Sequence, residues 1–447
     1  MPNLLIQNAT LINEGRMYPA SVWIQDDRIQ AIFEGEVPES VLNQCTCLPA
    51  DGKWLIPGVI DDHVHFREPG LEHKADLRTE SSAAVAGGVT SFMEMPNTKP
   101  ATTSIEAWED KMQRASERAH ANYAFYLGAT NDNLDVLEKA DFSRVCGVKV
   151  FMGSSTGNML VDNERTLEGL FQRIPSVVAV HAESEAIIQA NKAYYLANGP
   201  EVLDIHYHSL IRSAEACYAS TARAVELAQR WNARLHVLHL STEKELSLFD
   251  EGHLSGKRIT AEACLLHLWF HDADYSVKGN AIKCNPSIKT LADRAALRQG
   301  VASGRVDVVA TDHAPHLWAE KQGDCLTAAS GAPFIQYSLP AMLDLVHRSV
   351  FTPEVLVERM CHAPARIYSV QKRGFLREGY YADLVLIDPK RTWTVQKQDI
   401  LSKCGWSPLE GTTLTGSIET TWVNGRPAYQ NGRIVDAVGG RALEFGS

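Results

Sequence analysis

The sequence predicts an α/β fold: a (β/α)8 TIM-type barrel with a small β-sandwich domain that is formed from both termini. Apolar, strand-like runs alternate with helix-like segments over residues 57–369, which is typical of βα units and a parallel sheet. Residues 1–56 and 370–447 instead contain short β-type runs separated by turn residues. Because 447 residues exceed what one compact core usually holds, we expect the two terminal segments to form one small domain beside the barrel domain.

Individual elements are expected in the same order along the chain. Apolar runs predict eight barrel strands, at 58–63, 88–95, 122–128, 147–152, 177–181, 234–239, 258–263 and 306–311. Helices are predicted at 104–119, 184–197 and 209–230, the last because it is rich in alanine. Near the C-terminus, Ala382–Asp388 and Thr420–Arg426 have strand composition, and the Asn424-Gly425 pair predicts a hairpin.

Composition and charge exclude several classes of function. A formal net charge of -11 argues against binding to nucleic acid. Nine cysteines without CxxC spacing indicate reduced thiols rather than a disulfide framework. No apolar run reaches the length of a membrane span, and the N-terminal segment lacks the order of a signal peptide. We therefore expect a cytoplasmic protein with a small-molecule substrate and no membrane partner, and a homodimer by analogy with similar folds.

Side chains able to bind metal recur at the ends of the predicted strands, where barrel active sites form. His63 and His65 end the first strand, and residues i and i+2 of a strand point to the same side, so both imidazoles can face one ion. His181, His239 and Asp312 end the fifth, sixth and eighth strands. The His63–His65 pair taken alone is equally compatible with ordinary strand-end histidines, and His181 or His239 taken alone is better explained as a core histidine. Their shared position at strand ends favours a metal site.

Lys149 stands inside the apolar fourth strand. A buried ammonium group must be paired, neutralised or chemically changed. One outcome is carboxylation of its amine by carbon dioxide, which makes an anionic oxygen ligand. The alternative is a salt bridge with a neighbour such as Glu183.

These residues and four motifs together resemble the dihydroorotases of the amidohydrolase superfamily. The motifs are His63-Val64-His65-Phe66-Arg67-Glu68-Pro69-Gly70, Met95-Pro96-Asn97-Thr98, Asn285-Pro286 and Thr311-Asp312-His313-Ala314-Pro315-His316. The resemblance implies two Zn²⁺ per subunit, bridged by a carboxylated Lys149 and a hydroxide. His63, His65, Lys149 and Asp312 would hold one ion, and Lys149, His181 and His239 the other, with Asp312 as the catalytic proton shuttle.

The same resemblance implies the substrate-binding residues Arg67, Asn97, Asn285, His316 and Gly331, the last in a loop that approaches the substrate ring. The expected reaction is the interconversion of N-carbamoyl-L-aspartate and dihydroorotate in pyrimidine synthesis. Allantoinases and dihydropyrimidinases share the metal residues, but their substrates have no carboxylate for Arg67 to bind. A metal-free scaffold that partners aspartate transcarbamoylase is a further alternative, disfavoured because every ligand position is filled.

Overall fold

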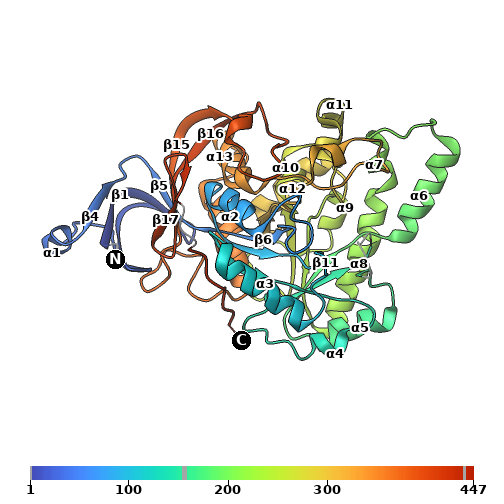
Figure 1. The fold of residues 1–447 in the computed structure, drawn as a ribbon, viewed down its shortest axis with the longest axis horizontal. Helices are drawn as coiled ribbons and strands as arrows, with labels where there is room; N and C mark the ends of the chain where they lie inside the picture. The colour runs from blue at the N-terminus through green and yellow to red at the C-terminus, as the bar shows by residue number, and fades with distance from the viewer. Residues whose placement is uncertain (1–2, 154–158, 436–438, 447) are drawn as a thin grey trace.

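The computed structural model describes residues 3–153, 159–435 and 439–446. In Figure 1 the strands of the two termini lie at one end of the molecule, and helix α6 (Glu185–Asn198) lies at the far end from them. The barrel strands and their helices lie between.

All eight predicted barrel strands are present. They are β6 (Val59–Val64), β7 (Val89–Glu94), β8 (Asn122–Phe125) continued by β9 (Leu127–Gly128), β10 (Val148–Phe151), β11 (Val177–His181), β12 (Arg234–Val237), β13 (Ile259–Cys264) and β14 (Val308–Ala310). Every pairing among them is parallel. The ends of the last and first strands meet through the Val64–His313 bridge, where the His65 N–H donates to the His313 carbonyl at 2.8 Å. The predicted fold class is confirmed.

Helices fill the connections between these strands. They are α2 (Leu77–Ala86), α3 (Ile105–Arg118), α4 (Leu134–Leu137), α5 (Glu164–Arg173), α6, α7 (His206–Ile211), α8 (Ala214–Trp231), α9 (Glu243–Leu246), α10 (Leu265–Trp269), α11 (Tyr275–Lys278), α12 (Leu291–Ser303), α13 (Ser338–His347), α14 (Pro353–Val357) and α15 (Ala363–Ile367). Helix α3 shows why they form: the Ser104 side chain caps its first turn, and Trp108, Met112 and Ala115 form its buried stripe.

The predicted helix at 209–230 is wrong as a single element. The structure has α7 and α8 there, separated at Arg212 and Ser213. Ser213 is extended, and its hydroxyl accepts a hydrogen bond from the Ala216 N–H, so it starts a new helix. The break places Arg212 in an ion pair with the buried Glu183. A tertiary ion pair and a local cap therefore override the alanine-rich composition.

Strands from both termini join in one mostly antiparallel sheet. Its members are β1 (Asn3–Asn13), β2 (Arg16–Gln25), β3 (Arg28–Phe33), β4 (Thr46–Pro49), β5 (Trp54–Pro57), β15 (Leu384–Thr394), β16 (Thr413–Val423), β17 (Arg426–Gln430) and β18 (Arg433–Ile434), with the short helix α1 (Glu39–Leu42) between β3 and β4. The N-terminal and C-terminal strands meet where β5 pairs with β15. Asn424 and Gly425 both have positive φ, as the predicted hairpin between β16 and β17 requires.

The hydrophobic core is continuous between this sheet and the barrel. Ile56 and Val385 of the sheet belong to the same buried cluster as Val89 and Phe92 of the barrel. The domain boundaries at 56–57 and 369–370 stay a prediction. All nine cysteines are free thiols. Among the described residues, no helix is long and apolar enough to cross a membrane.

Candidate metal centre and substrate cavity

One cavity of about 320 Å³ opens at the C-terminal ends of the barrel strands. All eleven residues predicted for the site line it: His63, His65, Arg67, Asn97, Lys149, His181, His239, Asn285, Asp312, His316 and Gly331. They come from eight separate stretches of the chain, and the parallel barrel brings them together because the carboxyl ends of all its strands point the same way. The roles assigned to them stay predictions.

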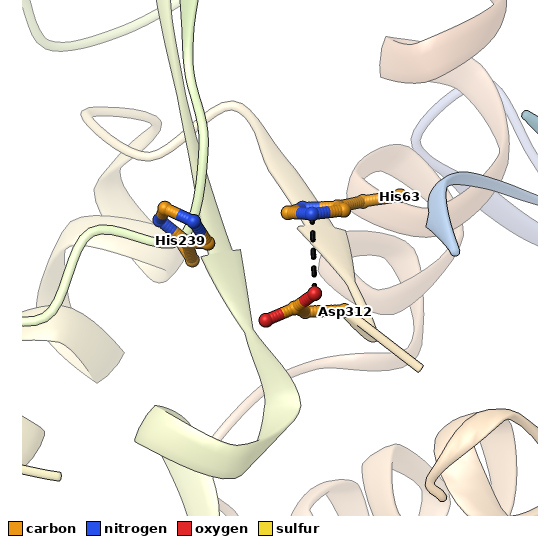
Figure 2. Close-up of side chains that lie close together, drawn as sticks. All are labelled: His63, His239 and Asp312. Atoms are coloured by element: carbon orange, nitrogen blue, oxygen red, sulfur yellow. Dashed lines mark ion pairs between the residues drawn. The ribbon is translucent and has the colours of Figure 1, made fainter. Parts of the chain in front are cut away.

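Three of these residues form a compact group of potential metal ligands. One donor atom from each of His63, His239 and Asp312 lies within 4.8 Å of the others (Figure 2). The Asp312 carboxylate oxygen Oδ1 is 3.2 Å from Nε2 of His63 and 3.0 Å from Nε2 of His65. His239 and Asp312 both have positive φ, at 41° and 48°, so each side chain leaves its strand end in a constrained direction.

Electrostatics around His63 favour a positive charge. Burial disfavours a charged imidazole, but Glu262 and Asp312 outweigh it and raise the pKa of His63 to about 10. The same two carboxylates would attract a metal cation as they attract a proton. This donor set, buried imidazoles beside an aspartate, suits Zn²⁺ and related ions, so the residues present fit the implied metal.

Glu262 is a site residue that the sequence interpretation missed. Its Oε1 atom is 2.9 Å from Nδ1 of His63 and accepts the His239 N–H at 2.9 Å. One buried carboxylate thus orients two predicted ligands from different strands. The sequence feature that could have identified it is a glutamate inside the apolar strand Ile259–Cys264, where an unpaired charge would be costly.

His181 and Lys149 line the same cavity, and His181 lies directly beside His239. Nδ1 of His181 is 2.8 Å from Nε2 of His239, and Nε2 of His181 is 2.9 Å from Oε2 of Glu183. Lys149 is only 1% exposed, and burial lowers its pKa to about 7. Glu183 pairs with Arg212 and His181, so the alternative of a Lys149–Glu183 salt bridge is wrong. Lys149 forms no ion pair within the described part of the chain.

Arg67 and His316 line the cavity beside the candidate metal ligands. Nη2 of Arg67 lies 3.1 Å from Nε2 of His316, and its Nε donates to the Pro315 carbonyl. Arg67 is 8% exposed, and no carboxylate among the described residues lies within 4.0 Å of it. Burial and the cations Arg67 and Lys74 lower the pKa of His316 to about 2, so its ring is neutral. Nδ1 of this ring lies 3.2 Å from the Lys74 ammonium, and Nε2 also lies 3.0 Å from the Ser330 carbonyl oxygen.

The two asparagines differ in their surroundings. Oδ1 of Asn97 accepts from Nδ1 of His65 at 2.8 Å, so Asn97 orients a predicted metal ligand as well as lining the cavity. Oδ1 of Asn285 is buried and has no hydrogen-bond partner among the described residues. An unpaired buried amide oxygen is costly, and a ligand in the cavity would supply its donor.

A buried lysine holds the loop that carries Gly331. Lys321 is 1% exposed, and its Nζ donates to the carbonyls of Lys283, Ala329 and Gly331 at 3.1, 2.7 and 2.8 Å. Gly331 has a φ of 130°, and a Cβ atom there would lie 2.6 Å from the Ala314 carbonyl oxygen. The position therefore requires glycine, and Lys321 fixes this wall of the cavity.

Comparisons with known proteins identify the family to which this chain is similar. The model of the Amidohydrolase family matches residues 204–428, and the Dihydro-orotase-like model matches residues 52–245. A dihydroorotase of Halobacterium salinarum is 35% identical over 360 residues, covering 80% of this chain and 82% of that protein. An allantoinase of Bacillus velezensis is 30% identical over 438 residues, covering 96% and 94%. The solved L-hydantoinase (dihydropyrimidinase) of Arthrobacter aurescens has a TM-score of 0.93 at 28% identity and covers 99% of this chain and 100% of that chain.

Proposed function

We propose that this chain, which belongs to the amidohydrolase family, is a metal-dependent dihydroorotase. The proposed reaction is the reversible cyclisation of N-carbamoyl-L-aspartate to (S)-dihydroorotate plus water, a step of pyrimidine synthesis. The observation that carries this proposal is the buried Arg67 guanidinium, which faces the cavity without a carboxylate partner among the described residues.

A buried cation without an anion is costly, and an anionic ligand removes that cost. The planar fork of Arg67 can grip a carboxylate through two parallel hydrogen bonds. Dihydroorotate and N-carbamoyl-L-aspartate carry such a carboxylate, whereas allantoin, hydantoin and dihydrouracil do not. His316 is neutral and lies against Arg67, so it adds hydrogen-bonding capacity without competing for the anion.

His63, His65, His181, His239, Lys149 and Asp312 would hold two Zn²⁺ ions. Such ions polarise the amide carbonyl and make water nucleophilic near neutral pH. Lys149 supports a bridging role because its lowered pKa leaves much of the amine neutral, the form that reacts with carbon dioxide to give a carbamate.

Asp312 is proposed to move the proton. Its carboxylate is held between His63 and His65, and its pKa lies well below the ordinary value because both imidazoles, against the cost of burial, stabilise the anion. In the hydrolytic direction it accepts a proton from the attacking water and delivers it to the ring nitrogen as the C–N bond breaks. In the cyclising direction the same transfers run in reverse.

Allantoin and hydantoin hydrolysis are the rival activities, because the allantoinase and L-hydantoinase relatives are similar over nearly the whole chain. The test is steady-state kinetics of the metal-loaded protein on dihydroorotate, allantoin, dihydrouracil and hydantoin side by side. We expect kcat/KM for dihydroorotate to exceed the others by about 10³ or more, since loss of a paired charge in a buried site costs several kcal/mol. Faster turnover of allantoin or hydantoin would contradict the proposal. A zinc content near zero together with no activity would instead support the metal-free scaffold.

A further inference from the structure

A second cavity, of about 560 Å³, lies at the opposite end of the barrel strands. Val177 and Arg234, which begin β11 and β12, line it together with Arg258, which directly precedes β13. His181 and His239 stand at the other ends of β11 and β12, in the candidate metal centre. The length of the strands therefore separates the two cavities.

Two arginines occupy neighbouring positions in this second cavity. Leu235 of β12 is in register with Ile259 of β13, so Arg234 and Arg258 each stand one residue before a paired position. The Leu235 N–H donates to the Arg258 carbonyl at 2.8 Å, which fixes the two backbones side by side. Adjacent strands lie about 5 Å apart, and like charges in such positions destabilise a sheet.

No carboxylate among the described residues offsets this repulsion directly, because none lies within 4.0 Å of either guanidinium. Arg234 donates to the Ile367 carbonyl, and Nε of Arg258 donates to the Asn232 carbonyl at 2.8 Å. Each guanidinium has five N–H groups, so most of their donors remain available. Burial and repulsion by Arg258 lower the pKa of Arg234.

The other two cations of the cavity are already neutralised. Lys257 pairs with Asp307 at 3.0 Å, and Arg366 pairs with Glu358. The uncompensated positive charge is therefore concentrated on Arg234 and Arg258. The chain as a whole is acidic, with a net charge of -11, so an excess of basic residues over its surface does not explain why these two arginines lie side by side without acidic partners.

We propose that this cavity binds an organic phosphate, with its phosphate group held by Arg234 and Arg258. Guanidinium forks match the geometry of phosphate oxygens and bind them in pairs. The organic part would pack on the apolar wall formed by Val177, Leu235, Leu254 and Ile367. The volume lies in the range of small-molecule sites. This site goes beyond the proposed reaction and does not depend on it.

Calorimetric titration of the full-length, metal-loaded protein tests the proposal, with uridine monophosphate, adenosine monophosphate, uridine and inorganic phosphate as probes. We expect at least one nucleoside monophosphate to bind about tenfold more tightly than inorganic phosphate, and uridine not to bind. Arg234→Gln and Arg258→Gln should each weaken binding about tenfold or more, because each removes charge-assisted hydrogen bonds. Arg305→Gln is the matched control, since Arg305 lies outside this cavity and pairs with Glu251 on the surface.

Arg258 is exposed, so its variant keeps the test decisive if Arg234→Gln does not fold. Absence of binding by every probe at millimolar concentration would overturn the proposal, as would unchanged binding by Arg258→Gln. Displacement of the bound nucleotide by dihydroorotate would place it in the candidate metal centre and would also overturn it. Equal affinity for inorganic phosphate and both nucleotides would refute the role of the apolar wall.

Discussion

Nη2 of Arg67 lies 3.1 Å from Nε2 of His316, and the two residues come from opposite ends of the barrel sequence. One side chain is a buried cation, and the other is a neutral ring that also contacts Lys74, Glu320 and the Ser330 carbonyl. Together they form a corner of the cavity that carries positive charge beside the candidate metal ligands.

Replacing Arg67 with lysine tests this corner. We expect Arg67→Lys to retain its metals and to lose about 10²-fold or more in kcat/KM for dihydroorotate, because a point charge cannot reproduce two parallel hydrogen bonds. The measurement is steady-state kinetics with metal analysis, and Arg144→Lys on the surface is the control. A near-normal rate would remove Arg67 from the role of carboxylate clamp.

Asp312→Asn should fold normally and lose turnover. Removal of a proton-transfer group typically costs about 10²–10⁴ in rate, and weakened metal binding would add to this loss. Single-turnover kinetics and metal content separate the two effects. Wild-type turnover with two metals bound would exclude Asp312 as the proton shuttle.

Lys149→Ala should lose metal and activity together, since the proposed bridge disappears with the side chain. Short carboxylic acids added to the buffer should restore part of both by occupying the gap left by the carbamate. Metal content and activity are measured with and without the acid. An unmodified Lys149 amine in a fully metal-loaded crystal structure would refute the bridge.

Glu262→Gln should weaken metal binding by about 10–100-fold, because a neutral amide is a weaker acceptor for Nδ1 of His63 than the carboxylate and orients this ligand less well. Competition with a chelator measures the affinity, and thermal unfolding of the same variant reports any general loss of stability. Glu419→Gln, which removes a surface ion pair with Lys53, serves as the control. Unchanged metal affinity in a folded Glu262→Gln protein would leave this glutamate a purely structural role.

Lys321→Met should raise KM more than it lowers kcat, because the loop that carries Gly331 loses the Lys321 hydrogen bonds to its Ala329 and Gly331 carbonyls. The substituted side chain has similar length and stays apolar, so the buried space remains filled. Kinetics over a range of substrate concentrations separate the two constants. An equal fall in kcat with unchanged KM would contradict a positioning role.

The sequence by itself determined the eight barrel strands, the hairpin at Asn424-Gly425 and the set of eleven residues that line one cavity. Apolar runs of strand length mark buried strands, and a barrel places every strand end at one face, so position along the chain indicated the candidate metal ligands. The family resemblance supplied the five substrate-binding residues. Only the tertiary structure decided the break between α7 and α8, the contacts of Glu262 with His63 and His239, the Lys321 clamp and the neighbouring Arg234 and Arg258. Each of these features depends on contacts between residues that are far apart in the sequence. Local hydrophobic pattern and secondary-structure propensity describe neighbouring residues only, so they cannot predict such contacts.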